Sequence, residues 1–262
     1  MKTIGIIGGG NMGAAIAGRI RGAFKVVVCE QDAGRRASLK RKFKTVFKDL
    51  PELVKVSDAI IVAVKPQDIE GVLSAMKQAG ADKKLVISIA AGITTAYLER
   101  RLGPGSRVVR TMPNMPAMIG EGVTAVAGGR RASKADVAKT LKIFSRVGET
   151  VVIGEKGMDA VTAVSGSGPA YVFLFAEILR DAALSLGLDA RVSEKLVTST
   201  LLGSAHLLAG QKDDPSALRA RVTSKGGTTQ AATDVFMKHR IGGIFQEALT
   251  AARDRARKLA KK

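Results

Sequence analysis

Residues 4–13, Ile-Gly-Ile-Ile-Gly-Gly-Gly-Asn-Met-Gly, decide the fold of this chain. The first four predict a short buried strand, and Ala14 to Ile20 has helical periodicity. Between them, Gly8, Gly10 and Gly13 fit G-x-G-x-x-G, in which the glycines permit a tight turn, admit a pyrophosphate and let helix and strand pack closely. A glycine-rich turn without a ligand is the alternative. The residues expected to contact a dinucleotide are Ile7, Gly8, Gly9, Gly10, Asn11, Met12 and Gly13.

The next strand supplies the acidic residue that such a loop requires. Lys25 to Cys29 predicts a strand that ends at Glu30, about 20 residues after the glycines. A carboxylate at this position accepts hydrogen bonds from the ribose hydroxyls. Arg35 and Arg36 begin the next helix, within reach of a phosphate. We therefore expect Glu30 and Arg35 to contact the cofactor.

The rest of the first half alternates apolar strands with helices, which predicts a doubly wound parallel sheet covered on both faces. The expected strands are 58–64, 85–89, 107–112, 123–127 and 150–153, and the expected helices are 50–56, 69–78, 94–102 and 134–147. Ligands of such sheets bind beyond the carboxyl ends of the strands. The glycine loop, Lys65-Pro66, Ala90-Ala91-Gly92 and Met112 to Met115 should therefore converge there. We assign residues 1–154 to a dinucleotide-binding Rossmann domain, so the fold class is α/β.

Strand patterns stop near Glu155, and residues 155–262 predict an all-helical domain. The expected helices are 157–164, 170–186, 193–208, 215–221 and 228–258. The helix from Ala170 to Leu186 is apolar almost all round, so it must be buried on more than one side. We expect a partner chain to cover it, which makes the protein at least a homodimer.

Two loops of the second half have the character of binding sites. In Ser224-Lys225-Gly226-Gly227-Thr228-Thr229, the glycines precede a first helical turn whose free amides attract anions. A capped helix start after a flexible turn explains that loop equally well when it is taken alone. In the stretch 165–171, Ser-Gly-Ser-Gly-Pro-Ala-Tyr, Ser167 can cap a helix and Pro169 suits its first turn. This second loop is expected to form the wall of a site between the domains.

Composition indicates a cytoplasmic enzyme that binds small anions. The net charge is +19, but the cations are scattered, aromatic residues make up 4% and tryptophan is absent, so nucleic-acid binding is not favoured. No uninterrupted run reaches the ~18 to 20 apolar residues of a membrane span, and the chain opens directly on a strand rather than on a secretory signal. The single cysteine and the two histidines argue against a disulfide and a metal site.

Five motifs together resemble the pyrroline-5-carboxylate reductase family over essentially the whole chain. They are GGGNMG (8–13), VAVKPQ (62–67), RTMPNMPAMIGEG (110–122), VSGSGPAY (164–171) and LRARVTSKGGTTQAA (218–232). The resemblance implies reduction of 1-pyrroline-5-carboxylate to L-proline by NADPH or NADH, the last step of proline biosynthesis. It also implies a Rossmann domain followed by a helical dimerisation domain, with dimers often assembled into rings.

The resemblance also implies roles for individual residues. Binding of the substrate carboxylate is assigned to Ser224, Gly226, Gly227 and Thr228, and Ser167 is assigned to the substrate site. Thr229 is the catalytic candidate, and because its hydroxyl is a weak acid we expect it to orient a protonated iminium. The residues placed beside the cofactor are Val64, Lys65, Pro66, Ala90, Ala91, Gly92 and Asn114. Asn11 and Asn114 are the only asparagines of the chain, although Asn11 could simply cap its helix, and Lys65 could be a surface lysine in a turn.

Cofactor choice and reaction class leave alternatives open. Where many relatives have Pro, this chain has Lys225, and it lacks the Asn-Arg or Ser-Arg pair that often holds the 2′-phosphate of NADP. Glu30 would repel that phosphate and Arg35 would attract it, so we expect both cofactors to be accepted, with NADH no worse than NADPH. A dehydrogenase of 3-hydroxy acids is a second class, but Lys195, its best candidate lysine, lacks the glycine-rich context. A non-catalytic or nucleic-acid-binding use of the basic surface is a third.

Overall fold

The computed structural model describes residues 2–260 and divides them between two compact units. One unit comprises the described residues up to 167 together with residues 251–260, and the other comprises residues 168–250. The first unit is built on an eight-stranded sheet, and the second consists of helices.

The sheet has the strand order β3-β2-β1-β4-β5-β6-β7-β8. Its strands are β1 (Thr3–Ile7), β2 (Lys25–Cys29), β3 (Val46–Phe47), β4 (Ala59–Val62), β5 (Leu85–Ser88), β6 (Arg107–Pro113), β7 (Gly122–Gly128) and β8 (Gly148–Val152). Sequential strands run outward in both directions from β1, so the order reverses between β1 and β4. This reversal is the position at which doubly wound sheets bind their ligands.

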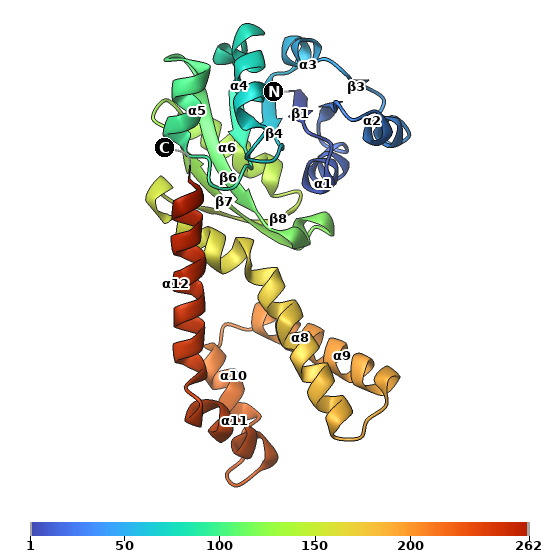
Figure 1. Ribbon diagram of the computed structural model, residues 1–262, viewed down its shortest axis with the longest axis vertical. Coiled ribbons are helices and arrows are strands. Elements are labelled where there is room, and N and C mark those ends of the chain that lie inside the picture. Colours follow the sequence, from blue (N-terminus) through green and yellow to red (C-terminus); the bar gives the residue numbers. More distant parts are fainter. Residues whose placement is uncertain (1, 261–262) are drawn as a thin grey trace. The chain divides into compact units, whose positions relative to one another are not determined.

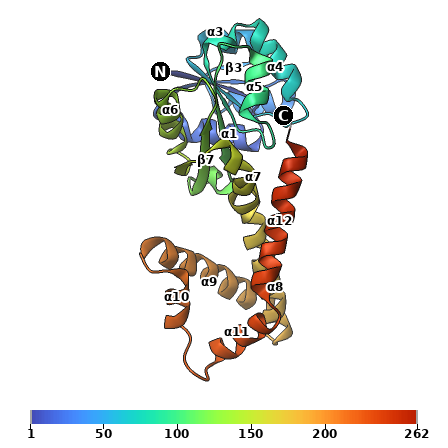
Figure 2. The same cartoon turned by 90° about the vertical axis from the view of Figure 1, so that its left-hand side faces the viewer.

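Helices cover both faces of the sheet (Figures 1 and 2). Helices α3 (Leu50–Val56), α4 (Ile69–Gln78) and α5 (Thr95–Leu102) pack on one face, and α1 (Asn11–Ile20), α2 (Ala33–Lys40) and α6 (Lys134–Phe144) on the other. The sequence of strand β4 is continuously apolar because both of its faces are buried. Ile60 and Val62 enter one core, whereas Ala59 and Ile61 enter the other.

The expectation of a parallel sheet is wrong at one strand pair, because β6 and β7 are antiparallel. They are joined by residues 114–121, which hold only a short 3-10 turn (Met115–Met118), and a parallel connection needs a crossover of a dozen or more residues. The two-residue strand β3 is also absent from the expected elements. It is too short for a periodic pattern and is defined by its pairing with β2.

The helical part contains α8 (Gly168–Ser185), α9 (Ala190–Gly210), α10 (Pro215–Arg221), α11 (Thr228–Lys238) and α12 (Ile241–Leu259). The single helix expected over 228–258 is wrong, since the chain breaks between α11 and α12. Arg240 takes a left-handed φ of 53°, which ends a right-handed helix, and Gly242-Gly243 follow with low helix propensity.

Helix α8 begins at Gly168, within the motif expected to start it, but the cap expected at Ser167 is wrong. Helix α7 (Met158–Val161) continues through a π-turn (Thr162–Gly166) into α8, and Ser167 has helical dihedral angles. The Ser167 N–H donates to the Thr162 carbonyl at 2.8 Å, so this residue continues a helical path and caps nothing. Among the described residues, one helical stretch, Glu155–Ser185, is long and apolar enough to cross a membrane by length and composition alone.

The unit of residues 168–250 has almost no core of its own. Ser193 and Val197 are its buried residues in the part of the chain that the structure describes. Large apolar side chains lie exposed along its helices, including Val172, Phe173, Leu174, Phe175 and Ile178 on α8. The expectation that a lone chain exposes a large apolar surface here is confirmed.

Candidate functional site

Close backbone packing fixes the glycine loop. Gly8 has φ +99°, and a Cβ placed there would lie 2.5 Å from the Ala63 carbonyl oxygen. A Cβ on Gly13 would collide with the Gly8 carbonyl oxygen, whereas one on Gly10 would meet no protein atom. Gly10 is the N-cap of α1 and provides no side-chain cap, so Asn11 is a first-turn residue and not a cap. The loop therefore leaves open space above the start of α1, which suits a pyrophosphate.

Glu30 ties this loop to the end of β2. The Gly9 N–H donates to Glu30 Oε2 at 2.9 Å, and the Asp32 N–H donates to Oε1 at 2.9 Å. Arg35 Nε lies 3.4 Å from Oε2, and only 6% of Glu30 is exposed. Two amides and one guanidinium thus compensate the carboxylate before any ligand binds.

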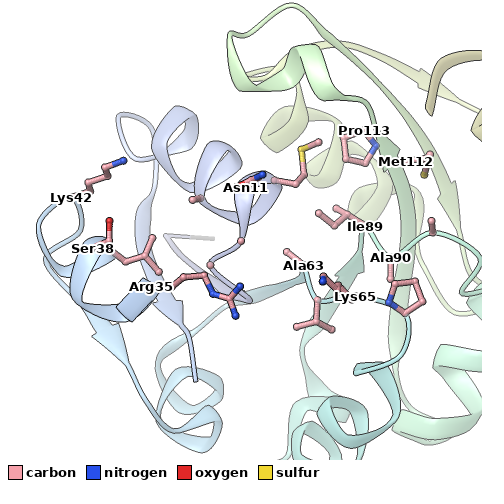
Figure 3. Close-up of a pocket in the computed structure, with 18 residues that line it drawn as sticks. Asn11, Arg35, Ser38, Lys42, Ala63, Lys65, Ile89, Ala90, Met112 and Pro113 are labelled. Atoms are coloured by element: carbon pink, nitrogen blue, oxygen red, sulfur yellow. The ribbon is translucent and has the colours of Figure 1, made fainter. Parts of the chain in front are cut away.

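Two adjoining cavities of about 610 and 380 Å³ lie over the carboxyl ends of β1, β4 and β5, and they share Gly10, Arg35 and Ala63 to Lys65. Figure 3 shows the larger one. The predicted cofactor residues that line them are Ile7, Gly8, Gly9, Gly10, Asn11, Met12, Glu30, Arg35, Val64, Lys65, Pro66, Ala90 and Ala91. Residues from five separate segments of the chain therefore meet at one place, as expected for this sheet.

Three predicted cofactor residues line neither cavity. Gly13 packs against the loop backbone, and Gly92, with φ +71°, sits where a Cβ would lie 3.1 Å from the Leu259 carbonyl oxygen. Asn114 Oδ1 accepts a hydrogen bond from the Val123 N–H at 2.9 Å, which braces the turn between β6 and β7. None of the three therefore forms part of the cavity wall.

Sequence reasoning identified Arg35 but missed Ser38 and Lys42, which line the same cavity. Asp32 caps helix α2 by accepting the Arg35 N–H at 2.7 Å, and this start turns Arg35 and Ser38 toward the larger cavity, with Lys42 just beyond the helix. Figure 3 shows these three side chains across the cavity from Ala90 and Met112. The spacing i, i+3, i+7 could have revealed a shared helix face. Arg36 instead donates to the backbone carbonyls of Glu30 and Gln31.

Cys29 lines the smaller cavity as a neutral thiol. Burial, followed by the nearby Glu30, raises the pKa of this thiol to about 11. At neutral pH it is therefore protonated and is a poor nucleophile. Among the described residues, no group of three or more His, Cys, Asp or Glu side chains is arranged to hold a metal ion.

The glycine loop before α11 belongs to the other unit. Gly226 has φ +72° and its N–H donates to Gln230 Oε1 at 2.7 Å, while the Gly227 N–H donates to the Ser224 carbonyl at 3.0 Å. The two glycine amides are therefore used inside the loop. The first-turn amides of Thr228 and Thr229 have no carbonyl partner within the helix, and free amides at such a helix start attract anions. Ser167 lies in the first unit, so its proximity to this loop stays a prediction.

Comparison with known proteins covers both halves of the chain. A family model described as pyrroline-5-carboxylate reductase dimerisation matches residues 155–259, and one described as NADP oxidoreductase coenzyme F420-dependent matches residues 3–92. A pyrroline-5-carboxylate reductase of Synechocystis is 39% identical over 99% of this chain and 98% of its own length. The chain belongs to the pyrroline-5-carboxylate reductase family. As a member of it, this reductase is an NAD(P)H-dependent oxidoreductase with a dimerisation domain.

Solved structures agree with this membership. The pyrroline-5-carboxylate reductase of Coxiella burnetii is 35% identical, with a TM-score of 0.93 over 99% of this chain and 98% of its own. A Plasmodium falciparum pyrroline carboxylate reductase with NADP bound is 29% identical, with a TM-score of 0.87 over 99% and 98%. The apolar helices of this reductase lie within residues 155–259, which match the dimerisation model. The family membership sets aside the second candidate class, a 3-hydroxy acid dehydrogenase.

Proposed function

We propose that this reductase transfers a hydride from NADPH or NADH to the C=N carbon of 1-pyrroline-5-carboxylate and so forms L-proline, the final step of proline biosynthesis. The observation that carries the proposal is the family match over the whole chain together with the packed glycine loop beneath an open cavity. Cytoplasmic location and assembly of dimers into larger rings belong to the same proposal.

The cavity suits a nicotinamide dinucleotide at each point where the ligand would touch it. The space above Gly10 admits the pyrophosphate at the start of α1, and Glu30 offers its carboxylate to the ribose. The ends of β5 and β6, with Ala90, Ala91 and Met112, then remain for the nicotinamide. The bound cofactor supplies the hydride, so the protein's task is to position both reactants and exclude competing reactions.

The proposed substrate-binding site is the loop before α11. The carboxylate would bind at the first-turn amides of Thr228 and Thr229 and at the Ser224 hydroxyl, and Gly226 and Gly227 give the loop its shape. The Thr229 hydroxyl would hold the ring nitrogen of an iminium that is already protonated. A threonine hydroxyl is too weak an acid to donate that proton efficiently near neutral pH.

Dimerisation belongs to the same mechanism. We assign residues 1–154 to cofactor binding and residues 155–262 to dimerisation and substrate binding. The exposed apolar side chains of α8 need a cover that residues 168–250 of one chain do not provide. A second copy that covers them would bring the active site close to the subunit boundary.

Acceptance of both cofactors follows from the charges around Glu30. Like charges in contact near a surface oppose each other by about 4 kcal/mol at an effective dielectric constant of ~20. Two amides already hold the Glu30 carboxylate, and Arg35 and Lys42 line the adjoining wall. The cations offset the repulsion of a 2′-phosphate, and Glu30 still serves the ribose of NADH. We expect NADH to be no worse than NADPH.

One assay tests the proposal directly. Oxidation of NADPH and of NADH is followed with 1-pyrroline-5-carboxylate, beside a panel of 3-hydroxy acids and an electrophoretic shift on DNA. Turnover with the imine alone is expected. Turnover only with a 3-hydroxy acid, or DNA binding without any turnover, would overturn the proposal.

A further inference from the structure

Met112 lies at the end of the larger cavity opposite the α2 face (Figure 3). It lies on β6, just beyond the buried strand residues, and its side chain is half-buried. It also packs against the small core of Ala125, Ala127 and Met158. Its position therefore decides how much room remains at this end of the cavity.

A glycine touches Met112 from the π-turn. A Cβ placed on Gly166 would lie 2.6 Å from Met112 Cε and 3.8 Å from its Cγ, so the methionine side chain runs across the bare face of this glycine. The π-turn is marked by the Ser167 N–H, which donates to the Thr162 carbonyl five residues earlier. The Thr162 hydroxyl also donates to the Met158 carbonyl at 2.8 Å. Such turns within helices occur often at functional sites.

The neighbours of Met112 determine where its side chain would move if position 166 carried a side chain. A side chain at position 166 would meet the far end of a flexible methionine, and that end can move where backbone could not. The core of Ala125, Ala127 and Met158, against which Met112 packs, occupies one side. The open side is the cavity that Met112 lines, so the displaced methyl group would enter the space of the ligand.

We propose that Gly166 is a positioning residue for the cofactor: its missing side chain keeps Met112 out of the nicotinamide end of the cavity. The inference rests on the proposed function in that it takes this cavity to hold NAD(P)H. It gives Gly166, one residue of the second glycine-rich motif, a role in the dinucleotide site that its sequence does not reveal.

The test is direct nucleotide binding to the full-length protein, measured by fluorescence titration. Gly166→Ala is expected to raise the Kd of NADPH and of NADH equally, by about 10-fold, because the two cofactors share the nicotinamide half. Its melting temperature should be unchanged or higher, because alanine favours helical turns over glycine. Gly168→Ala is the matched control, since a Cβ there meets no protein atom, and it should bind both cofactors as the wild type does.

A rescue distinguishes positioning from a general structural role. In a Met112→Ala background no side chain remains to be displaced, so adding Gly166→Ala should change the Kd by less than about 2-fold. Wild-type affinity in Gly166→Ala, or an undiminished loss in the Met112→Ala background, would overturn the inference. Failure of the wild-type protein itself to bind either nucleotide would instead overturn the proposed function, and the inference with it.

Discussion

The sheet unit and the helical unit of this reductase differ in where their stability comes from. In the sheet unit, every residue of β4 is completely buried between two helix layers of the same chain. In the helical unit, α8 has no buried residue, and Phe173 is 58% exposed. One unit is complete within a single chain, whereas the other requires an apolar partner. Nucleotide binding should therefore survive loss of the dimer, and turnover should not.

A charge on α8 tests this contrast with the largest expected effect. Phe173→Asp would bury an unpaired carboxylate in the dimer and should weaken dimerisation by more than about 100-fold. Light scattering is expected to show a monomer that still binds NADPH but has lost turnover. Val56→Asp, at a 45% exposed site on α3, is the control and should stay dimeric. A Phe173→Asp monomer that remains active at micromolar concentration would remove the link between assembly and catalysis.

Two glycines of the sheet unit separate packing from ligand binding. Gly13→Ala places a Cβ against the Gly8 carbonyl oxygen, and a backbone atom cannot easily move away. The free energy of unfolding should therefore fall by about 1–3 kcal/mol, and nucleotide binding should be lost. Gly10→Ala meets no protein atom and should keep the wild-type melting temperature while losing nucleotide affinity by about 100-fold. Equal melting temperatures for the two variants would contradict the packing argument.

The substrate loop tests whether the helical unit does chemistry as well as assembly. Thr229→Ala should lower kcat by ~10 to 1000-fold, as expected for the loss of one well-placed polar contact, and Thr229→Ser should retain most activity. Gly227→Val should raise the KM for 1-pyrroline-5-carboxylate, because its side chain meets Ser224, while the nucleotide Kd stays near wild type. Full activity of Thr229→Ala would exclude this hydroxyl from the mechanism.

Charge on the α2 face should have the smallest effect. Lys42→Ala is expected to raise the KM for NADPH by about 3- to 10-fold and to leave that for NADH unchanged, because only NADPH carries the 2′-phosphate. Lys44→Ala, two residues away and outside the cavity lining, is the control. Glu30→Ser should shift kcat/KM toward NADPH. A wild-type preference for NADPH above about tenfold, unchanged in Glu30→Ser, would show that this carboxylate does not face the ribose.

The sequence by itself determined the features that depend on near neighbours along the chain. Strand and helix positions in the first half, the glycine turn and Glu30 at the end of β2 all follow from residues within about one element of each other. The sequence also predicted the apolar surface of the helix over 170–186, because the spacing of apolar residues indicates how much of a helix must be buried. These signals were enough to locate the cavity that we propose for the cofactor.

Only the tertiary structure decided the features that depend on contacts between distant segments. The antiparallel β7, the Asn114 brace on Val123 and the Met112–Gly166 contact join residues that no local pattern connects. The spacing of Arg35, Ser38 and Lys42 suggests a shared face, but only the tertiary structure places that face beside the cavity. Local propensity fixes where an element forms, but which atoms meet is settled by close packing of elements far apart in the sequence.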